Sequence, residues 1–380
     1  MGFIPNDILD TIHSRAADHD QANDFPADDL ADLQKCGYLT AFVPEEYGGA
    51  GLSLREIAAE QTTLAKAAPA TALAINMHHI VVGLGRYMLR HGNDKGAYIL
   101  REAANGAIFG FGISEPGNDL VLFGSITQAH PTDDGGFSFH GTKVFTSLAP
   151  VWTHLATFGR WDSPDGPRSV FAILTRNGGG FTVEDDWDTL GMRATQSHTT
   201  ILEGAIAPQS QVLTITPPGP STNPVVFGIF ANFEILLAAT YTGIGHRAIE
   251  VAADHVKKRQ SVKNQTSYSN DPDIRWRLAE AAIIMDGLQP QIDRLADDMD
   301  ADVDRGSLWM PQLSALKNRC AESSKIAVEQ SIRSCGGSSY FNNHELSRLY
   351  RDVLAGLFQP SDQESLHSAW ANMVLGPVEE

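Results

Sequence analysis

The spacing of apolar residues changes twice along the chain and divides it into three regions. In residues 5–105 apolar side chains recur three and four positions apart, which is the spacing of helices. From about residue 106 to 215 the period becomes two, as in Phe137–His140, which indicates strands. Helical spacing returns after the proline-rich connector 216–223 and continues almost to the end of the chain.

Clusters of glycine and aspartate, such as Asp133–Gly136 and Gly178–Gly180, separate the alternating runs as turns. The middle region therefore predicts an antiparallel sheet or small barrel of roughly six to eight strands. We predict an α+β fold with an N-terminal helical domain (residues 1–105), a central antiparallel β-barrel or sheet domain (106–215) and a C-terminal four-helix bundle (216–380).

Within the last region, apolar residues step by three and four from Leu278 to Met299. This pattern is the seam of a helix that packs into a bundle, and a long coiled coil is the alternative reading. We favour the bundle. Pro290 lies inside the run and predicts a kink or a break there.

Composition narrows the class of protein. The net charge of −18 argues against a general nucleic-acid or membrane-surface binder, because both of those partners are polyanions. The three cysteines have no metal-ligand spacing and indicate neither a metal site nor a disulfide framework. The N-terminal segment does not have the pattern expected of a signal peptide, and the short apolar runs, such as Ile80–Leu84, do not predict membrane insertion. The expected location is the cytoplasm.

Short motifs, in this order of helical and β regions, resemble the acyl-CoA dehydrogenase superfamily, which includes flavin-dependent monooxygenases on the same fold. The segments that carry the resemblance are Tyr38–Leu52 (YLTAFVPEEYGGAGL), Phe111–Asn118 (FGISEPGN), Gly141–Ser147 (GTKVFTS), Leu190–Pro208 (LGMRATQSHTTILEGAIAP) and Gly336–Asp352 (GGSSYFNNHELSRLYRD). The fourth segment is the most specific, because it is close to the family's L-G-M-R-x-S strand.

The resemblance implies bound FAD. It places Ser114 at the family's flavin-contacting Thr position, packs Phe145 against the isoalloxazine ring, and lets Ser147 hydrogen-bond near N5. Phe111 and Ile113 would complete the lining of the ring. Read without the family, Phe145 is plain sheet core.

A second group of residues matches the family's contacts to the rest of the cofactor. Arg259 falls at the arginine that commonly reaches the flavin pyrophosphate of a neighbouring subunit, although the F-G that follows in the family is replaced here. Arg333 stands at the place of a flavin-contacting Gln, and Gly336 and Gly337 allow close approach of a cofactor. Both arginines have a plain surface or salt-bridge reading. The resemblance further implies a homo-oligomer, a homotetramer.

The usual catalytic base is missing. Acyl-CoA dehydrogenases remove an α-proton with a Glu, which most members carry in a Y-E-G-T motif soon after R-D. Gln359 and Pro360 stand there in this chain. Some members place the Glu on an earlier helix, where Glu234 is the candidate here, one residue out of register. An ordinary helix-end charge is the alternative reading of Glu234.

Three functions remain open at this stage. The leading one is an acyl-CoA dehydrogenase that oxidises an acyl-CoA or similar small molecule and passes electrons to FAD, with an electron-transfer partner possible downstream. The second is a monooxygenase of the same fold that uses reduced flavin and oxygen and needs no α-proton base. The third is a non-catalytic scaffold that retained the fold.

Overall fold

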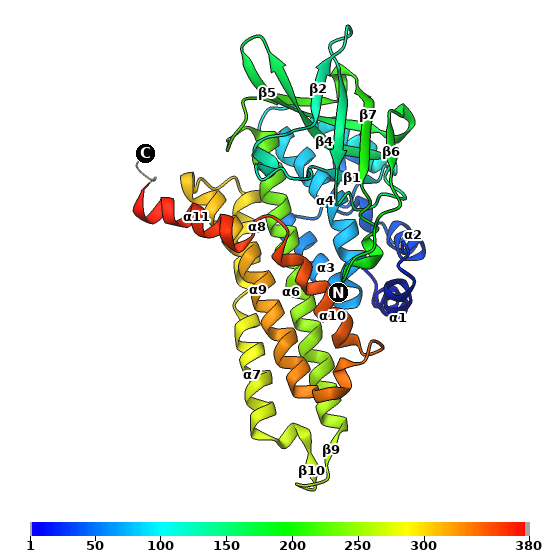
Figure 1. Ribbon diagram of the computed structural model, residues 1–380, viewed down its shortest axis with the longest axis vertical. Helices are drawn as coiled ribbons and strands as arrows, with labels where there is room; N and C mark the ends of the chain where they lie inside the picture. Colours follow the sequence, from blue (N-terminus) through cyan, green and yellow to red (C-terminus); the bar gives the residue numbers. More distant parts are fainter. Residues whose placement is uncertain (1, 377–380) are drawn as a thin grey trace.

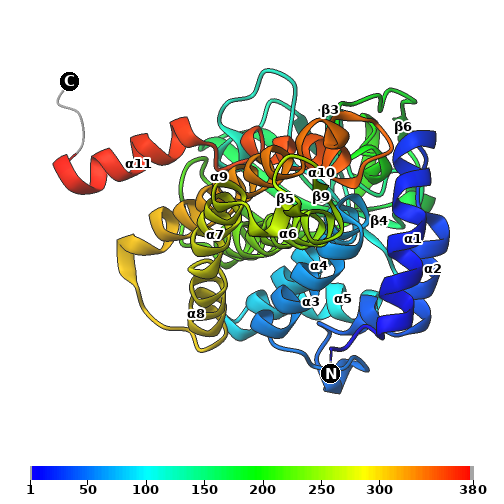
Figure 2. The same cartoon turned by 90° about the horizontal axis from the view of Figure 1, so that it is seen from below.

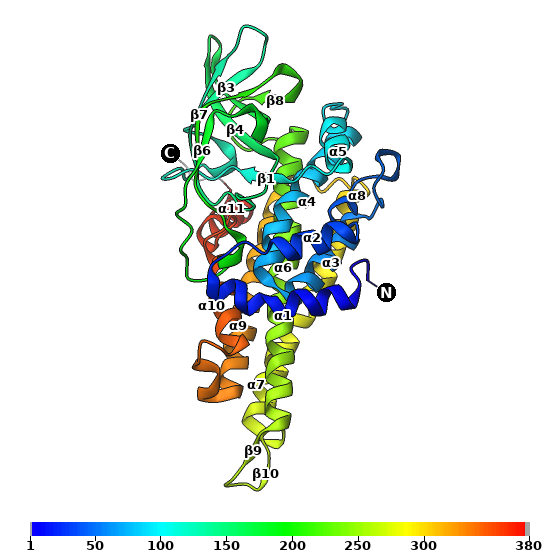
Figure 3. The same ribbon diagram turned by 90° about the vertical axis from the view of Figure 1, so that its right-hand side faces the viewer.

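The computed structural model describes residues 2–376, which form one elongated body (Figure 1). The sheet lies at one end of the long axis, and long C-terminal helices extend to the other end. The N-terminal helices pack beside the middle of the body, below the sheet (Figure 3). The predicted α+β order of helices, sheet and helices is confirmed.

The N-terminal region is helical from its start. Ser53 begins the third helix with a capping box, because its hydroxyl accepts from the Glu56 backbone and the Glu56 carboxylate accepts from the Ser53 backbone. The next helix begins at Pro69 and is buried along most of its length. The helices are α1 (Asn6–Ala22), α2 (Ala27–Lys35), α3 (Leu54–Ala67), α4 (Pro69–Arg90) and α5 (Gly96–Ala104).

The middle region is an eight-stranded sheet with the order β6-β7-β3-β2-β4-β5-β8, and β1 is added on β4. The predicted turn at Asp133–Gly136 joins β2 to β3, with Gly135 at a φ of 80°. The strands are β1 (Phe109–Gly112), β2 (Gln128–Pro131), β3 (Phe137–Lys143), β4 (His154–Ser163), β5 (Gly166–Thr175), β6 (Phe181–Val183), β7 (Thr200–Ala207) and β8 (Val212–Thr216).

The sheet is mixed, which corrects the prediction of an antiparallel sheet. Strand β1 pairs with β4 in parallel from Phe109 opposite His154 to Gly112 opposite Thr157, and β2 meets β4 in parallel at Gln128 opposite Arg160. The alternation of side chains is the same in both kinds of pair, so the sequence pattern did not distinguish them. Strand β1 also contacts helix α4.

The C-terminal region packs around one long helix, α6 (Pro224–Lys258), which contacts α3, α4 and α9. A short hairpin of β9 (Gln260–Ser261) and β10 (Thr266–Ser267) follows at the far end of the body (Figure 1). The remaining helices are α7 (Pro272–Asp286), α8 (Gln289–Asp300), α9 (Trp309–Cys335), α10 (Glu345–Val353) and α11 (Gln363–Leu375).

Pro290 marks a break, as predicted. Helix α7 ends at Asp286 and α8 begins at Gln289, with Pro290 in the first turn of α8, where its missing N–H has no partner to lose. The apolar seam continues across the break, since Met285, Leu288, Ile292 and Leu295 are all buried.

Helix α6 is long and apolar enough to cross a membrane by composition alone, with a mean hydropathy of 1.6 over its best window. In the fold that window is 89% buried, against α3, α4 and α9. Its apolar surface is therefore explained by the protein core.

Candidate functional site

The ends of β1 and β3 meet at one place in the sheet. The Val144 N–H donates to the Ser114 carbonyl at 3.0 Å. Beside this contact, the Lys143 ammonium donates to Glu115 Oε1 at 2.6 Å, and neither of these two side chains has any exposed surface. The pair fastens together two of the segments that resemble the family.

A set of further donors satisfies the buried Glu115. Its carboxylate accepts the Ser125 hydroxyl at 2.5 Å and the backbone N–H of Ile126 at 2.8 Å, while Lys143 also donates to the Phe158 carbonyl at 2.8 Å. Burial raises the pKa of Glu115, but the Lys143 charge and these hydrogen bonds outweigh it and lower the pKa to about 2. Burial lowers the pKa of Lys143 to about 8. Sequence reasoning missed this pair, although each residue lies inside a quoted motif.

The segment after β3 presents an aromatic face. Phe145 has a φ of 57° and is 63% exposed, and its ring meets Trp187 edge-on at 6.1 Å. The next residue, Thr146, is fully buried and its hydroxyl has no hydrogen-bond partner. Ser147 is buried, with Oγ 2.7 Å from Ser197 Oγ. The exposed Phe145 ring is a surface suited to a planar ligand.

Helix α6 packs against the end of β1. Phe233 stacks on Phe111 with ring centroids 5.9 Å apart and an interplanar angle of 28°. Phe111 and Ile113 are both buried, at 8% and 4% exposure. Phe233 directly precedes Glu234, so the structure brings the candidate base onto the helix that packs against the end of β1.

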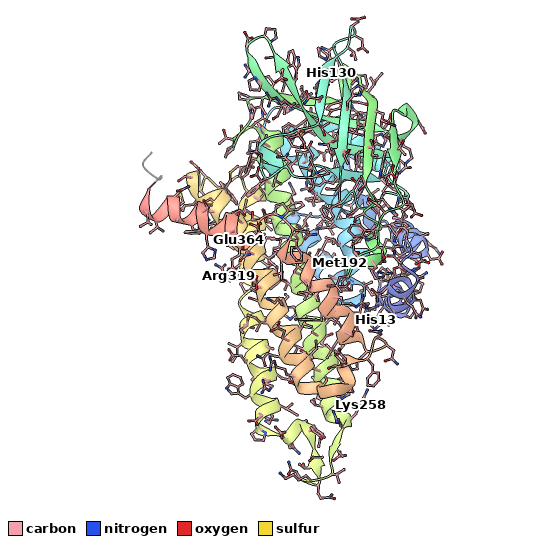
Figure 4. All side chains as sticks on the ribbon, viewed as in Figure 1. His13, His130, Met192, Lys258, Arg319 and Glu364 are labelled. Atoms are coloured by element: carbon pink, nitrogen blue, oxygen red, sulfur yellow. The ribbon has the colours of Figure 1, made fainter. Side chains whose placement is uncertain are left out.

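The last two motifs dock on each other. The Met192 N–H donates to Asp352 Oδ1 at 2.6 Å, and Arg351 donates to the Leu190 carbonyl and to Asp20 at 2.9 Å each. Met192 lies between the sheet and the lower part of the helical bundle (Figure 4). The segment 190–197 thereby supports Ser147 on one side and α10 on the other.

Glu234 is fully buried and is tied to the loop after α10. Its Oε1 accepts the Ser361 hydroxyl at 2.8 Å, whereas its Oε2 is buried without a partner. Burial raises the pKa of Glu234 to about 7, although the nearby Lys317 charge and Ser361 oppose that shift. Gln359, from the same loop, accepts from the Tyr241 hydroxyl at 2.6 Å. The two alternative base positions of the family therefore converge in space here.

The residues predicted to hold the rest of the cofactor lie at the other end of the body. Arg259 donates to the Cys335 carbonyl at 2.8 Å, and a Cβ added to Gly336 would lie 3.6 Å from its guanidinium. Arg333, Gly336 and Gly337 are exposed. Lys258, the neighbour of Arg259, lies far below Met192 (Figure 4). Phe233, which packs on Phe111, and Arg259 are separated by about 40 Å along α6.

A cavity of about 450 Å³ opens where α6 begins. Tyr87, Phe227 and Trp309 give it aromatic walls, and Asp302 and Asp304 lie at its edge. Phe227 precedes Glu234 by two helical turns, which places both side chains on one face of α6 about 10 Å apart. Within residues 2–376 no cluster of three or more His, Cys, Asp or Glu side chains has the arrangement of a metal site.

Comparisons with known proteins identify the family of the chain. The sequence profile of the acyl-CoA dehydrogenase N-terminal domain matches residues 8–104, and that of the acyl-CoA dehydrogenase C-terminal domain matches residues 235–358. Together the two matches cover more than half of the chain.

Individual relatives differ in what they are named for. The chain is 29% identical over 365 residues to L-evernosamine nitrososynthase of a Micromonospora species, which covers 92% of this chain and 84% of that protein. It is 26% identical over 360 residues to the putative acyl-CoA dehydrogenase YdbM of Bacillus subtilis, covering 93% and 91% of the two chains.

A solved structure of KijD3 with FMN and a dTDP-linked 3-amino sugar superposes with a TM-score of 0.86 and 28% identity. The superposition covers 98% of this chain and 92% of that one. The profiles, the fold and the docked motifs lead to the same conclusion: this chain belongs to the acyl-CoA dehydrogenase superfamily.

Proposed function

We propose that this protein is a flavin-dependent monooxygenase of the superfamily, which oxygenates the amino group of a small molecule. Flavin-dependent oxidoreduction is the chemistry of the family itself. The observation that carries the finer assignment is the state of the two base positions. Gln359 and Pro360 supply no carboxylate, and Glu234 is fully buried and bonded to Ser361.

The ring site, formed by Phe111, Ser114, Phe145 and Ser147, is the proposed binding place of the flavin ring. The exposed Phe145 ring offers one stacking face. Ser114 lies near it because the Val144 N–H donates to the Ser114 carbonyl, and Ser147 follows two residues after Phe145. A reduced flavin supplies two electrons to molecular oxygen, so that one oxygen atom reaches the substrate and the other leaves as water. The residues of this chain hold the ring, exclude water from its buried edge and orient the substrate.

Glu234 is the proposed anchor for the substrate nitrogen. Its Oε1 is held by Ser361, so the unpartnered Oε2 is the oxygen left to accept a donated hydrogen bond. A buried carboxylate prefers a charged or N–H donor as its partner. The amino sugar in the KijD3 structure and the nitrososynthase relative support a nitrogen substrate.

The acyl-CoA dehydrogenase remains a second candidate, since one observation favours it. Burial raises the pKa of Glu234 to about 7, which is suitable for a general base near neutral pH. In that reading Oε2 would take the α-proton of an acyl thioester. The relative YdbM, a putative acyl-CoA dehydrogenase, is consistent with this alternative.

Two assays on the flavin-loaded protein separate the candidates. With reduced flavin and a dTDP-linked 3-amino sugar, we expect oxygen uptake above that of flavin alone and a product heavier by oxygen. Anaerobic butyryl-CoA should leave the oxidised flavin absorption unchanged. Glu234→Gln should raise the KM for the amine by about 10- to 100-fold, because a charge-assisted hydrogen bond is weakened.

Glu203→Gln, at an exposed position on β7, is the matched control and should behave as wild type. Bleaching by butyryl-CoA that Glu234→Gln slows by about 10²- to 10⁴-fold would replace our proposal with the dehydrogenase. A protein that holds flavin and does neither reaction would contradict both candidates.

We further propose FAD and a homo-oligomer in which the far end of one subunit completes the cofactor site of another. Arg259, Gly336 and Gly337 lie together but about 40 Å from the ring site along α6. Helix α11 projects from the body (Figures 1 and 2), and Val374 and Leu375 at its end are 73% and 83% exposed. An exposed apolar surface of this kind is typical of an interface.

Sedimentation equilibrium at micromolar protein should therefore give a mass well above the 41.1 kDa of one chain, with a tetramer expected. Arg259→Ala should weaken flavin retention in the assembled protein, and flavin released by heat should chromatograph as FAD. A monomer that retains its flavin on dilution would contradict the shared site. The cytoplasmic location stays a prediction.

A further inference from the structure

Lys317 is a buried cation outside the quoted motifs. It lies on α9, has no exposed surface, and its ammonium donates to three backbone carbonyls of the loop that follows α10. The acceptors are Gly356 at 2.7 Å, Gln359 at 2.5 Å and Ser361 at 3.2 Å. An ammonium has three N–H donors, so the loop uses all of them.

The same loop reaches the site through its side chains. Ser361 donates to Glu234 Oε1 at 2.8 Å, and Ser314 Oγ, on α9, lies 2.8 Å from the Ser361 hydroxyl. Gln359 accepts from Tyr241, which is on α6 like Glu234. Helix α9, the loop and α6 are therefore joined through a single buried polar cluster, and Lys317 holds the backbone that carries the serine.

For both Lys317 and Glu234, burial shifts the pKa in one direction and the charge of the other residue shifts it back. Burial lowers the pKa of Lys317 and the Glu234 charge raises it again, with smaller effects from Asp362 and Glu322. On the other side, burial raises the pKa of Glu234 and the Lys317 charge lowers it. Each ion stabilises the charged form of the other across the loop.

We propose that Lys317 is a positioning residue of the site, which holds residues 356–361 over Glu234 and keeps that carboxylate charged and aimed by Ser361. The inference rests on the proposed function only in so far as Glu234 anchors the substrate nitrogen. A charged carboxylate binds an amine, whereas a protonated carboxyl that has lost its Ser361 contact turns freely and binds an amine weakly.

Two variants separate the effect of the Lys317 charge from the effect of its hydrogen bonds to the loop. Lys317→Met removes both the charge and the donors, so hydrogen exchange in residues 354–362 should rise by on the order of tenfold or more. The pH at which the Glu234 carboxyl protonates should rise by about one unit or more. Lys317→Arg keeps the charge, but its planar fork cannot serve three carbonyls around one nitrogen. It should loosen the loop and leave the protonation midpoint near wild type.

The carboxyl band in the infrared spectrum, assigned by its loss in Glu234→Gln, reports the midpoint. The matched control is Lys325→Met, two turns further along α9, where Lys325 is partly exposed and 3.7 Å from Glu322. That variant should leave both readouts unchanged. Wild-type exchange and midpoint in Lys317→Met would overturn the proposal.

If Lys317→Met does not fold, Ser361→Ala replaces it. This variant leaves Lys317 intact and removes one hydrogen bond to the carboxylate, so the midpoint alone should rise. An unchanged midpoint would refute the part of the proposal in which Ser361 aims the carboxylate, and wild-type hydrogen exchange in Lys317→Arg would refute the part in which Lys317 holds the loop. Neither readout needs turnover, so these experiments can succeed even when the monooxygenase assay fails, and the two failures are distinguishable.

Discussion

Lys143→Met is expected to lower the free energy of unfolding by about 3–5 kcal/mol. The substitution leaves Glu115 in the sheet with no exposed surface and no counter-charge, and it removes the donor to the Phe158 carbonyl. Urea unfolding followed by circular dichroism, at one fixed protein concentration because of the proposed assembly, measures the loss.

A double variant, Lys143→Met with Glu115→Gln, should recover part of that stability, because no buried charge remains. The control is Arg160→Met on β4, which breaks the exposed ion pair with Asp162 and should change stability by less than about 1 kcal/mol. A Lys143→Met variant as stable as the Arg160 control would mean that the sheet relaxes to solvate Glu115.

The same pair makes the wild type sensitive to acid. The pKa of Glu115 is lowered to about 2 in the fold from a reference value of 4.5. Its contribution to stability is therefore complete above about pH 4.5 and is lost progressively as the pH falls toward 2. The variant with Glu115→Gln should lose this part of the pH dependence.

Gly191→Ala should have the second large effect. A Cβ at this position would lie 2.2 Å from the Arg351 carbonyl oxygen and 2.7 Å from the Asp352 backbone nitrogen, and neither backbone atom can move alone. The segment must then separate from α10, which breaks the Met192 bond to Asp352. We expect a loss of about 1–3 kcal/mol or more, together with weaker flavin binding as the support of Ser147 moves.

Thermal unfolding and fluorescence titration with flavin measure the two effects. Gly287→Ala is the control, because the nearest atom to its Cβ is 4.0 Å away and its φ is −75°. That change should be neutral or slightly stabilising, since it restricts the unfolded chain. Normal flavin affinity in Gly191→Ala would show that the segment does not support the ring site.

The sequence predicted those features of the fold that depend on local spacing. The change of period near residue 106 and its return after 216 correspond to the start of β1 at Phe109 and of α6 at Pro224. The break at Pro290 followed from one residue, because proline has no N–H for a helix interior. In each case the signal lies within a few residues of its effect.

Features that depend on pairing across the chain were not predictable in the same way. The parallel partners Phe109 and His154 are 45 positions apart, and alternation alone gives no strand direction. Glu115 and Lys143 were each inside a quoted motif, but only the fold shows that they form one buried ion pair. The resemblance identified the two segments that carry Glu115 and Lys143, but only the folded sheet shows that these segments are in contact.

The candidate site shows the same division. Counting along the motifs identified Glu234 and Gln359 separately, whereas their meeting through Ser361 and Tyr241 depends on contacts across more than 100 residues. Lys317 was missed because a lysine in an amphipathic helix is usually at the surface, and nothing local indicates that three carbonyls will surround it.

The ion pair of Asp20 with Arg351 joins α1 to α10 across 331 positions of the chain. A ribosome adds roughly 5–20 residues per second, so α1 is synthesised roughly 15 to 70 s before Arg351 of α10. Helix α4 is likewise synthesised before α6, which covers its apolar side. The nascent N-terminal region therefore exposes apolar surface that chaperones can bind, and Glu234 gains its contact with Ser361 only at the end of synthesis.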